Sequence, residues 1–203
     1  MPATRLNARY ENFGANVTFV PRQVYAPSSD DELLGVLGKH HGQCLRAVGR
    51  LHSWSEIAVC EEVLIDLRHF REVVIHDEGP QLWAEVGAGC QIKVLLEELQ
   101  KRGLTLPSVG LITEQTIAGA ISTGTHGSGR HSLSHYVESL RIATYDSESR
   151  EPVIRTVDSG NELRAARCSL GLLGIVTSVR LPLRRQYMVE EHFRRCISTV
   201  ISE

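Results

Sequence analysis

The feature that most constrains this chain is a glycine-rich run, TIAGAISTGTHGSG, at residues 116–129. Glycine allows positive φ and close approach, and successive backbone N–H groups in such a run can form an anion-binding concavity. Flexible linkers are also rich in Gly, Ser and Thr, so the run alone leaves a structural loop open. It matches neither GxxxxGK[ST] nor GxGxxG, which argues against a P-loop nucleotidase and a Rossmann domain.

A second candidate site follows a predicted strand. The segment CLRAVG, residues 44–49, is apolar enough for a largely buried strand, and RLHSW directly after it reads as a turn. Binding and catalytic residues often lie on such loops, which raises the functional interest of His52. A partly buried histidine with satisfied hydrogen bonds, packed beside Ser53 and Trp54, is the alternative, and it stays open at this point.

Hydrophobic periodicity predicts an α+β protein in two lobes that meet around residues 104–115. Ser29 and Glu32 have the spacing of a capping box, which predicts a helix that ends near Gly42. Three strands follow without an intervening helix, which argues against strict βαβ alternation. The further elements expected are strands at 63–67, 73–76 and 81–89, a helix at 91–103, a hairpin of 137–146 with 151–159, a helical segment from 161, and strands at 175–183 and 187–193.

Composition excludes several classes of partner. The 203 residues carry a formal net charge of -2 with scattered basic residues, so nucleic acid is not an expected partner. No apolar run reaches the roughly 18 residues of a membrane span, and residues 1–14 lack the apolar region of a secretory signal. Five cysteines without a CxxC pair indicate reduced thiols. These features predict a soluble cytoplasmic protein without a membrane span.

A histidine metal site and a serine hydrolase are weaker alternatives. His131 and His135 are four residues apart, as in zinc-binding helices, and His126 is nearby. The surrounding glycines and serines disfavour a helix there, and no HExxH pattern is present. No GxSxG elbow occurs either. No metal ligand is therefore predicted. Bound zinc in a colourless purified protein would favour the histidine site.

Five segments together resemble FAD-linked oxidases of the vanillyl-alcohol-oxidase-like superfamily, most of all the alditol oxidases and the gulonolactone and arabinonolactone (aldonolactone) oxidases. The resemblance extends over residues 12–193 and depends on the order of the motifs more than on any one of them. These are AVGRLHSW (47–54), LIDLRHF (64–70), VGAG (86–89), TIAGAISTGTHGSG (116–129) and SLGLLGIVTSVRL (169–181).

The resemblance implies a two-lobed, PCMH-type FAD-binding domain of α+β class, with the flavin between the lobes. The first lobe is expected at residues 1–105 and the second at 106–186. Residues 187–203 would begin a truncated substrate domain. That domain holds most substrate-binding and catalytic groups in the family, so the isolated chain is expected to bind cofactor with little or no turnover.

The resemblance also assigns the site. The turn at residues 47–53 would wrap the pyrophosphate, and His52 takes the position of the histidine that bonds covalently to the flavin 8α-methyl carbon. Leu51 stands where the family often has glycine, which leaves the conformation of this loop open. No catalytic residue is assigned within this chain. The residues assigned to FAD are Ala47, Val48, Gly49, Arg50, Leu51, His52, Ser53, Thr116, Gly119, Thr123, Gly124, Thr125, His126, Ile175 and Val176.

The expected function is therefore oxidation of a CH–OH group of a polyol or sugar lactone, with hydride transfer to FAD and electrons passed to molecular oxygen or another acceptor. A flavin dehydrogenase that does not use oxygen is the alternative within the enzymes. A non-catalytic flavin- or nucleotide-binding module is the alternative outside them.

Overall fold

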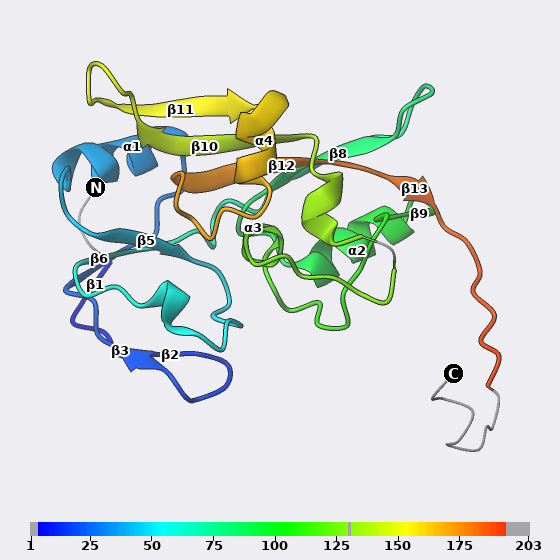
Figure 1. Ribbon diagram of the computed structural model, residues 1–203, viewed down its shortest axis with the longest axis horizontal. Coiled ribbons are helices and arrows are strands. Elements are labelled where there is room, and N and C mark those ends of the chain that lie inside the picture. Colours follow the sequence, from blue (N-terminus) through cyan, green and yellow to red (C-terminus); the bar gives the residue numbers. More distant parts are fainter. Residues whose placement is uncertain (1–3, 130, 194–203) are drawn as a thin grey trace.

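The computed structural model describes residues 4–129 and 131–193, and within them it contains two main sheets with helices packed against them (Figure 1). The smaller sheet has the strand order β1-β4-β6-β5, and the larger one the order β11-β10-β12-β8-β7. This mixed architecture agrees with the predicted α+β class.

The smaller sheet is built around a buried parallel strand. β6 (Val63–Asp66) lies between β4 (Gln23–Tyr25) and β5 (Leu45–Val48), parallel to both, and β1 (Arg5–Leu6) pairs antiparallel with β4. All four residues of β6 are buried, which explains its continuous apolar run. β5 is an edge strand of this sheet, and the turn with His52 follows directly after it.

The larger sheet is antiparallel throughout, and the predicted hairpin of residues 137–146 with 151–159 is present. β10 pairs with β11, and β7 pairs with β8. β12 lies between β10 and β8 and joins the two hairpins into one sheet. The strands are β7 (Val73–His76), β8 (Trp83–Gly87), β10 (Ser139–Tyr145), β11 (Pro152–Val157) and β12 (Ile175–Pro182).

Helices and short strands complete the molecule. α1 connects β4 with β5 and packs on β10 and β11, and α3 packs on β12. The helices are α1 (Asp30–Lys39), α2 (Ile92–Gln100), α3 (Ile117–Ser122) and α4 (Gly160–Ala166), with 3-10 turns η1 (Glu56–Ala58) and η2 (Leu133–Tyr136). The short pairs are β2 (Tyr10–Glu11) with β3 (Thr18–Phe19), and β9 (Leu104–Thr105) with β13 (Arg184–Arg185).

The N-terminus of α1 is capped nearly as predicted. Ser29 Oγ accepts a hydrogen bond from the backbone N–H of Glu32 at 3.2 Å. The Glu32 carboxylate accepts from the backbone N–H and hydroxyl of Ser28, one residue before the position that an ideal capping box uses. The cap places Leu33, Val36 and Leu37 on the buried face of α1.

One large hydrophobic core is shared by both sheets. The strand pairing places the boundary between the two sheets earlier in the chain than the lobe boundary expected from the sequence. The sheets separate between Asp66, at the end of β6, and Val73, at the start of β7. A lobe boundary at 105/106 would split the larger sheet, because β8 pairs with β12 from the second half of the chain and β7 pairs with β8. We therefore propose a division between residues 66 and 73.

The strand predicted at 187–193 is wrong. These residues contain no strand, and they extend away from the body of the molecule as the orange-red trace in Figure 1. Met188 and Phe193 are 97% and 90% exposed. A segment without a neighbouring strand cannot form the hydrogen bonds of a sheet, so strand-like residues alone do not produce a strand. Residues 194–203, the rest of the segment expected to begin a substrate domain, lie outside the described residues.

Candidate cofactor-binding site

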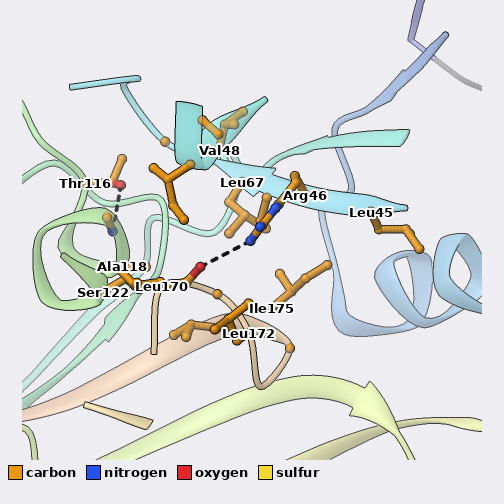
Figure 2. Close-up of a pocket in the computed structure, with 18 of the residues that line it drawn as sticks. Leu45, Arg46, Val48, Leu67, Thr116, Ala118, Ser122, Leu170, Leu172 and Ile175 are labelled. Atoms are coloured by element: carbon orange, nitrogen blue, oxygen red, sulfur yellow. Dashed lines mark hydrogen bonds between the residues drawn. The ribbon is translucent and has the colours of Figure 1, made fainter. Parts of the chain in front are cut away.

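A pocket of about 440 Å³ lies between the two sheets. One wall is formed by β5 and the turn after it, and the opposite wall by β10, the start of β12 and the loop at residues 169–174. α3 forms a third side (Figure 2). The volume lies within the range of roughly 300–1,000 Å³ that is usual for small-molecule and cofactor sites.

The two glycine-containing segments meet at this pocket, and Gly49 makes the contact. A Cβ atom added at Gly49 would lie 2.1 Å from Thr116 Oγ1 and 2.9 Å from its Cγ2. Thr116 is the N-cap of α3, and its hydroxyl accepts a hydrogen bond from Gly119 N at 3.3 Å (Figure 2). Glycine at position 49 is therefore required because the backbone of the first turn touches the cap of α3.

Arg46 connects opposite walls of the pocket. Its guanidinium reaches from β5 to the carbonyl oxygen of Leu170, to which it donates a hydrogen bond at 3.2 Å (Figure 2). Arg50 also lines the pocket, and none of the described lining residues carries a carboxylate. The fixed charges around the cavity are therefore positive, which favours an anionic ligand.

His52 lies at the rim formed by the turn after β5. Its ring stacks on Phe13, with centroids 4.5 Å apart, and its Nδ1 is buried without a hydrogen-bond partner among the described residues. Burial lowers the pKa of His52 below its ordinary 6.5, and the charge of Arg50 adds to this, whereas Glu114 opposes it. The imidazole is therefore neutral at pH 7 and able to act as a nucleophile.

Gln115 is a further polar residue at the pocket. Its Oε1 is buried and has no hydrogen-bond partner within the described chain. An unpaired buried polar atom costs about 1–3 kcal/mol, so such atoms are uncommon unless a ligand completes them. Two such unpaired atoms, Gln115 Oε1 and His52 Nδ1, belong to residues that line the same cavity.

The structure brings most of the predicted site residues to the pocket. Those that line it are Ala47, Val48, Gly49, Arg50, Leu51, His52, Ser53, Thr116, Gly119, Thr123, Ile175 and Val176.

Gly124, Thr125 and His126 do not line the pocket. Gly124 has φ +68°, and the N–H of Thr125 bonds back to the carbonyl of Ala120, so α3 ends there and the chain turns away. His126 Nδ1 instead interacts with the carbonyl of Gly127 at 2.9 Å. A role for these three residues in FAD binding stays a prediction.

Several pocket residues were not predicted. Gln115 directly precedes the predicted Thr116, and Arg46 directly precedes Ala47, so a wider window around each motif would have included them. Tyr145 carries no local signal, and the Leu170–Gly174 loop belongs to a motif of the resemblance but was not assigned to the site; β10 and β12 bring both to the pocket. The others are Leu37, Gln43, Leu45, Ile57, Ala58, Leu67, Ala118, Ser122, Ala143 and Thr144.

Leu51 adopts the conformation that glycine would favour. Its φ is +54°, in the left-handed region. Its side chain packs on a small core cluster that includes Val48 and Leu64. The turn therefore keeps the backbone shape of a glycine while the leucine side chain contributes packing.

The residues of the pocket fit a flavin dinucleotide. Gly49 leaves its backbone accessible beside the α3 cap, Arg46 and Arg50 provide positive charge for a pyrophosphate, and the wall from the larger sheet is apolar. The unpaired atoms of His52 and Gln115 offer polar contacts to a ring system. A dinucleotide, with its anionic pyrophosphate and its ring system, matches both the positive charge and the unpaired polar atoms of this pocket.

The histidines near residue 130 form no metal cluster. The rings of His131 and His135 stack with centroids 4.0 Å apart, beside Tyr136. No group of three or more metal-binding side chains occurs among residues 4–129 and 131–193. In the same part of the chain, no helix has the length and hydrophobicity to cross a membrane.

Several known proteins are similar to this chain in sequence, and others in fold. A long-chain alcohol oxidase of an uncultured marine euryarchaeote is 52% identical over 97% of this chain and 42% of its own length. An L-gulono-1,4-lactone dehydrogenase of Mycobacterium tuberculosis is 31% identical over 92% of this chain and 43% of its own length. The chain thus spans less than half the length of these relatives.

Among solved structures, cholesterol oxidase from Brevibacterium sterolicum superposes with a TM-score of 0.78, at 20% identity, over 87% of this chain and 37% of that one. This likeness supports the PCMH-type fold. A family model described as an FAD binding domain matches residues 21–151, which contain both glycine-rich turns and His52. The predicted resemblance is confirmed: the chain belongs to the FAD-binding domain family, and its cofactor is FAD.

Proposed function

We propose that residues 1–203 form the cofactor-binding part of an oxidase that removes a hydride from the CH–OH group of an alcohol or sugar lactone. The pocket in which Gly49 contacts Thr116 beside the unpaired His52 Nδ1 is the observation that supports this most. The names of the relatives suggest the substrate class. The matched region is 42% of the alcohol oxidase, so we assign cofactor binding to this chain, and turnover to a polypeptide of the relatives' length.

The residues of the chain bind and orient the cofactor. We place the pyrophosphate at the Gly49–Ser53 turn, where Arg46 and Arg50 supply positive charge. The flavin, when bound, accepts the hydride from substrate. Gln115, whose Oε1 is unpaired, would hydrogen-bond the bound cofactor, and the Leu170–Gly174 loop would shield it from water. A cytoplasmic location remains the proposal on the sequence grounds given above.

We further propose that His52 bonds covalently to the flavin. An imidazole nitrogen would bond to the 8α-methyl carbon, with one proton lost from the imidazole and one from the methyl group, and dioxygen or another two-electron acceptor would take up the released electron pair. The burial that lowers the pKa of His52 keeps the nitrogen lone pair available for this step.

Replacing His52 by alanine tests this assignment. Wild-type protein incubated with FAD should retain yellow colour in the pellet after acid precipitation, whereas His52→Ala should release all flavin into the supernatant. Before precipitation, the variant should still show bound-flavin absorption bands. His192→Ala, a substitution at a largely exposed histidine, should behave as wild type. Colour in the precipitated His52→Ala pellet would exclude His52, and uncoloured wild-type protein would exclude FAD binding by this chain.

The rate of covalent attachment should depend on pH in one direction. Only neutral imidazole is a nucleophile, and the pKa of His52 lies below 6.5. The rate should therefore fall as the pH drops through a pKa below 6.5 and level off at higher pH, where the imidazole is fully neutral. Acid-stable flavin, measured against time in a pH series, gives this profile. A midpoint above 6.5 would contradict the burial described for His52.

A flavin dehydrogenase that does not use oxygen is a second candidate, favoured by the name of the mycobacterial relative. The two functions differ in how fast the reduced flavin reacts with oxygen. Anaerobic photoreduction of the FAD-bound chain, followed by mixing with air-saturated buffer, distinguishes them. Reoxidation within seconds favours the oxidase, and persistence of reduced flavin for many minutes favours the dehydrogenase.

A further inference from the structure

A turn near the N-terminus is attached to the turn that carries His52. The turn at residues 12–16 connects β2 to β3, and three hydrogen bonds join it to residues 51–54. The N–H of Phe13 donates to the carbonyl of Leu51 at 2.8 Å. The Nδ2 groups of Asn12 and Asn16 donate to the carbonyls of Ser53 and Trp54, at 2.9 and 3.0 Å. Segments about forty residues apart thus form one unit.

Asn12 makes this turn rigid. Its side chain, in a residue only 7% exposed, donates to Asn16 Oδ1 and to the Ser53 carbonyl, and its Oδ1 accepts from the backbone N–H groups of Asn16 and Val17. All the main hydrogen-bonding positions of this amide are therefore used. At Gly14, an added Cβ would lie 2.8 Å from the Trp54 ring, so the two turns are in close contact.

Phe13 extends from this rigid turn and covers one face of the His52 imidazole. The centroids are 4.5 Å apart and the ring planes differ by 26°, a stacked arrangement. Phe13 does not itself line the pocket, and its residue is 61% exposed. A large apolar side chain left half in water, with its ring held against a histidine, calls for an explanation beyond core packing.

We propose that Phe13 is a positioning residue: its ring, held by the 12–16 turn, keeps the His52 imidazole in the one orientation from which it can bond to the flavin. This rests on the proposed covalent bond. The Nδ1 of His52 makes no hydrogen bond to the described chain, so no such bond fixes the rotation of the ring about χ2 from that side. Stacking against Phe13 supplies that restraint.

Phe13→Ala removes the stack and keeps the turn, because the hydrogen bonds of the turn involve backbone atoms and the two asparagines. Total bound flavin before denaturation should match wild type. The rate at which flavin becomes acid-stable should fall roughly 10- to 100-fold, since small losses of orientation have effects of that size. Phe13→Trp should restore most of the rate. Phe193→Ala, the same substitution at a 90% exposed site, should leave the rate unchanged.

A Phe13→Ala rate equal to wild type would overturn the proposal. If wild type binds flavin only reversibly, the covalent-bond proposal fails separately, and NMR of the His52 ring then decides the role of Phe13. In apo wild type, the ring protons should give one set of upfield-shifted signals, and in Phe13→Ala these should move downfield and broaden. Unshifted, sharp signals in the variant would show that Phe13 does not position the ring.

Discussion

Gly49→Ala is expected to abolish FAD binding, with at least a roughly 100-fold loss of affinity in a fluorescence titration. The added methyl group would lie 2.1 Å from Thr116 Oγ1, so the turn or the α3 cap must move. Such overpacking also costs about 1–3 kcal/mol of stability. Because the pyrophosphate is placed at this turn, a shift of it displaces every amide proposed to contact the phosphates, which is why affinity falls more than stability.

Two further variants make the Gly49 experiment specific. Gly49→Ala combined with Thr116→Ala removes the clashing hydroxyl and methyl groups, so affinity should partly recover, although the N-cap is lost at a cost of about 1 kcal/mol. Gly35→Ala, in the middle of α1 with nothing near the added carbon, should bind FAD normally and gain about 1 kcal/mol of stability. Normal FAD affinity in Gly49→Ala would show that this turn does not hold the cofactor.

Gly89→Ala should give the largest loss of stability, about 3 kcal/mol or more in urea unfolding, or a decrease in Tm of roughly 6–12 °C. The added Cβ would lie 1.8 Å from the carbonyl oxygen of Leu67 and 3.2 Å from that of Phe70. Both neighbours are backbone atoms, which cannot turn aside as a long side chain can. Gly89 is outside the pocket, so the primary effect is on folding.

Some loss of FAD affinity should accompany this destabilisation. The carbonyls of Ala88 and Cys90 accept hydrogen bonds from Ala118 and Ile117 at the start of α3, so a shift at Gly89 is transmitted to the α3 wall of the pocket. Gly129→Ala, where an added Cβ meets nothing within 4 Å, should change stability by less than about 0.5 kcal/mol. Equal stability of Gly89→Ala and Gly129→Ala would contradict the close backbone packing described here.

The individual elements were largely predictable because burial leaves a local pattern in the chain. The capping residues and buried stripe of α1, and the apolar residues Val63–Ile65 of β6, each indicate their surroundings within a few residues of sequence. The segment at 187–193 shows the limit of such patterns. Several of its residues are typical of strands, yet it has no neighbouring strand to pair with, and pairing is not a local property.

The arrangement of the strands was not predictable in the same way. β8 pairs with β12, about ninety residues later, and this pairing moves β7 and β8 into the larger sheet. Nothing in the sequence of β8 identifies that partner. The expected lobe boundary at residue 105 followed chain order, whereas the sheets follow pairing.

In the cofactor site, too, some residues could be predicted from local sequence and others could not. Gly49 and His52 were assigned through the resemblance, because the motif AVGRLHSW that contains them is recognisable from residue identity alone. Gln115 and Tyr145 were missed because a glutamine or tyrosine gains a role only from what surrounds it. Gly124 to His126 were expected at the pocket, but the left-handed Gly124 turns the chain away from it.

By itself the sequence indicated the family and its cofactor, because the glycine- and histidine-containing motifs and their order along the chain are recognisable from residue identity alone. Only the tertiary structure decided that Gly49 contacts Thr116, that Arg46 reaches Leu170, and that Phe13 covers His52. Those contacts join residues about 40 to 120 positions apart. Their distances depend on how two sheets pack together, which no local pattern encodes.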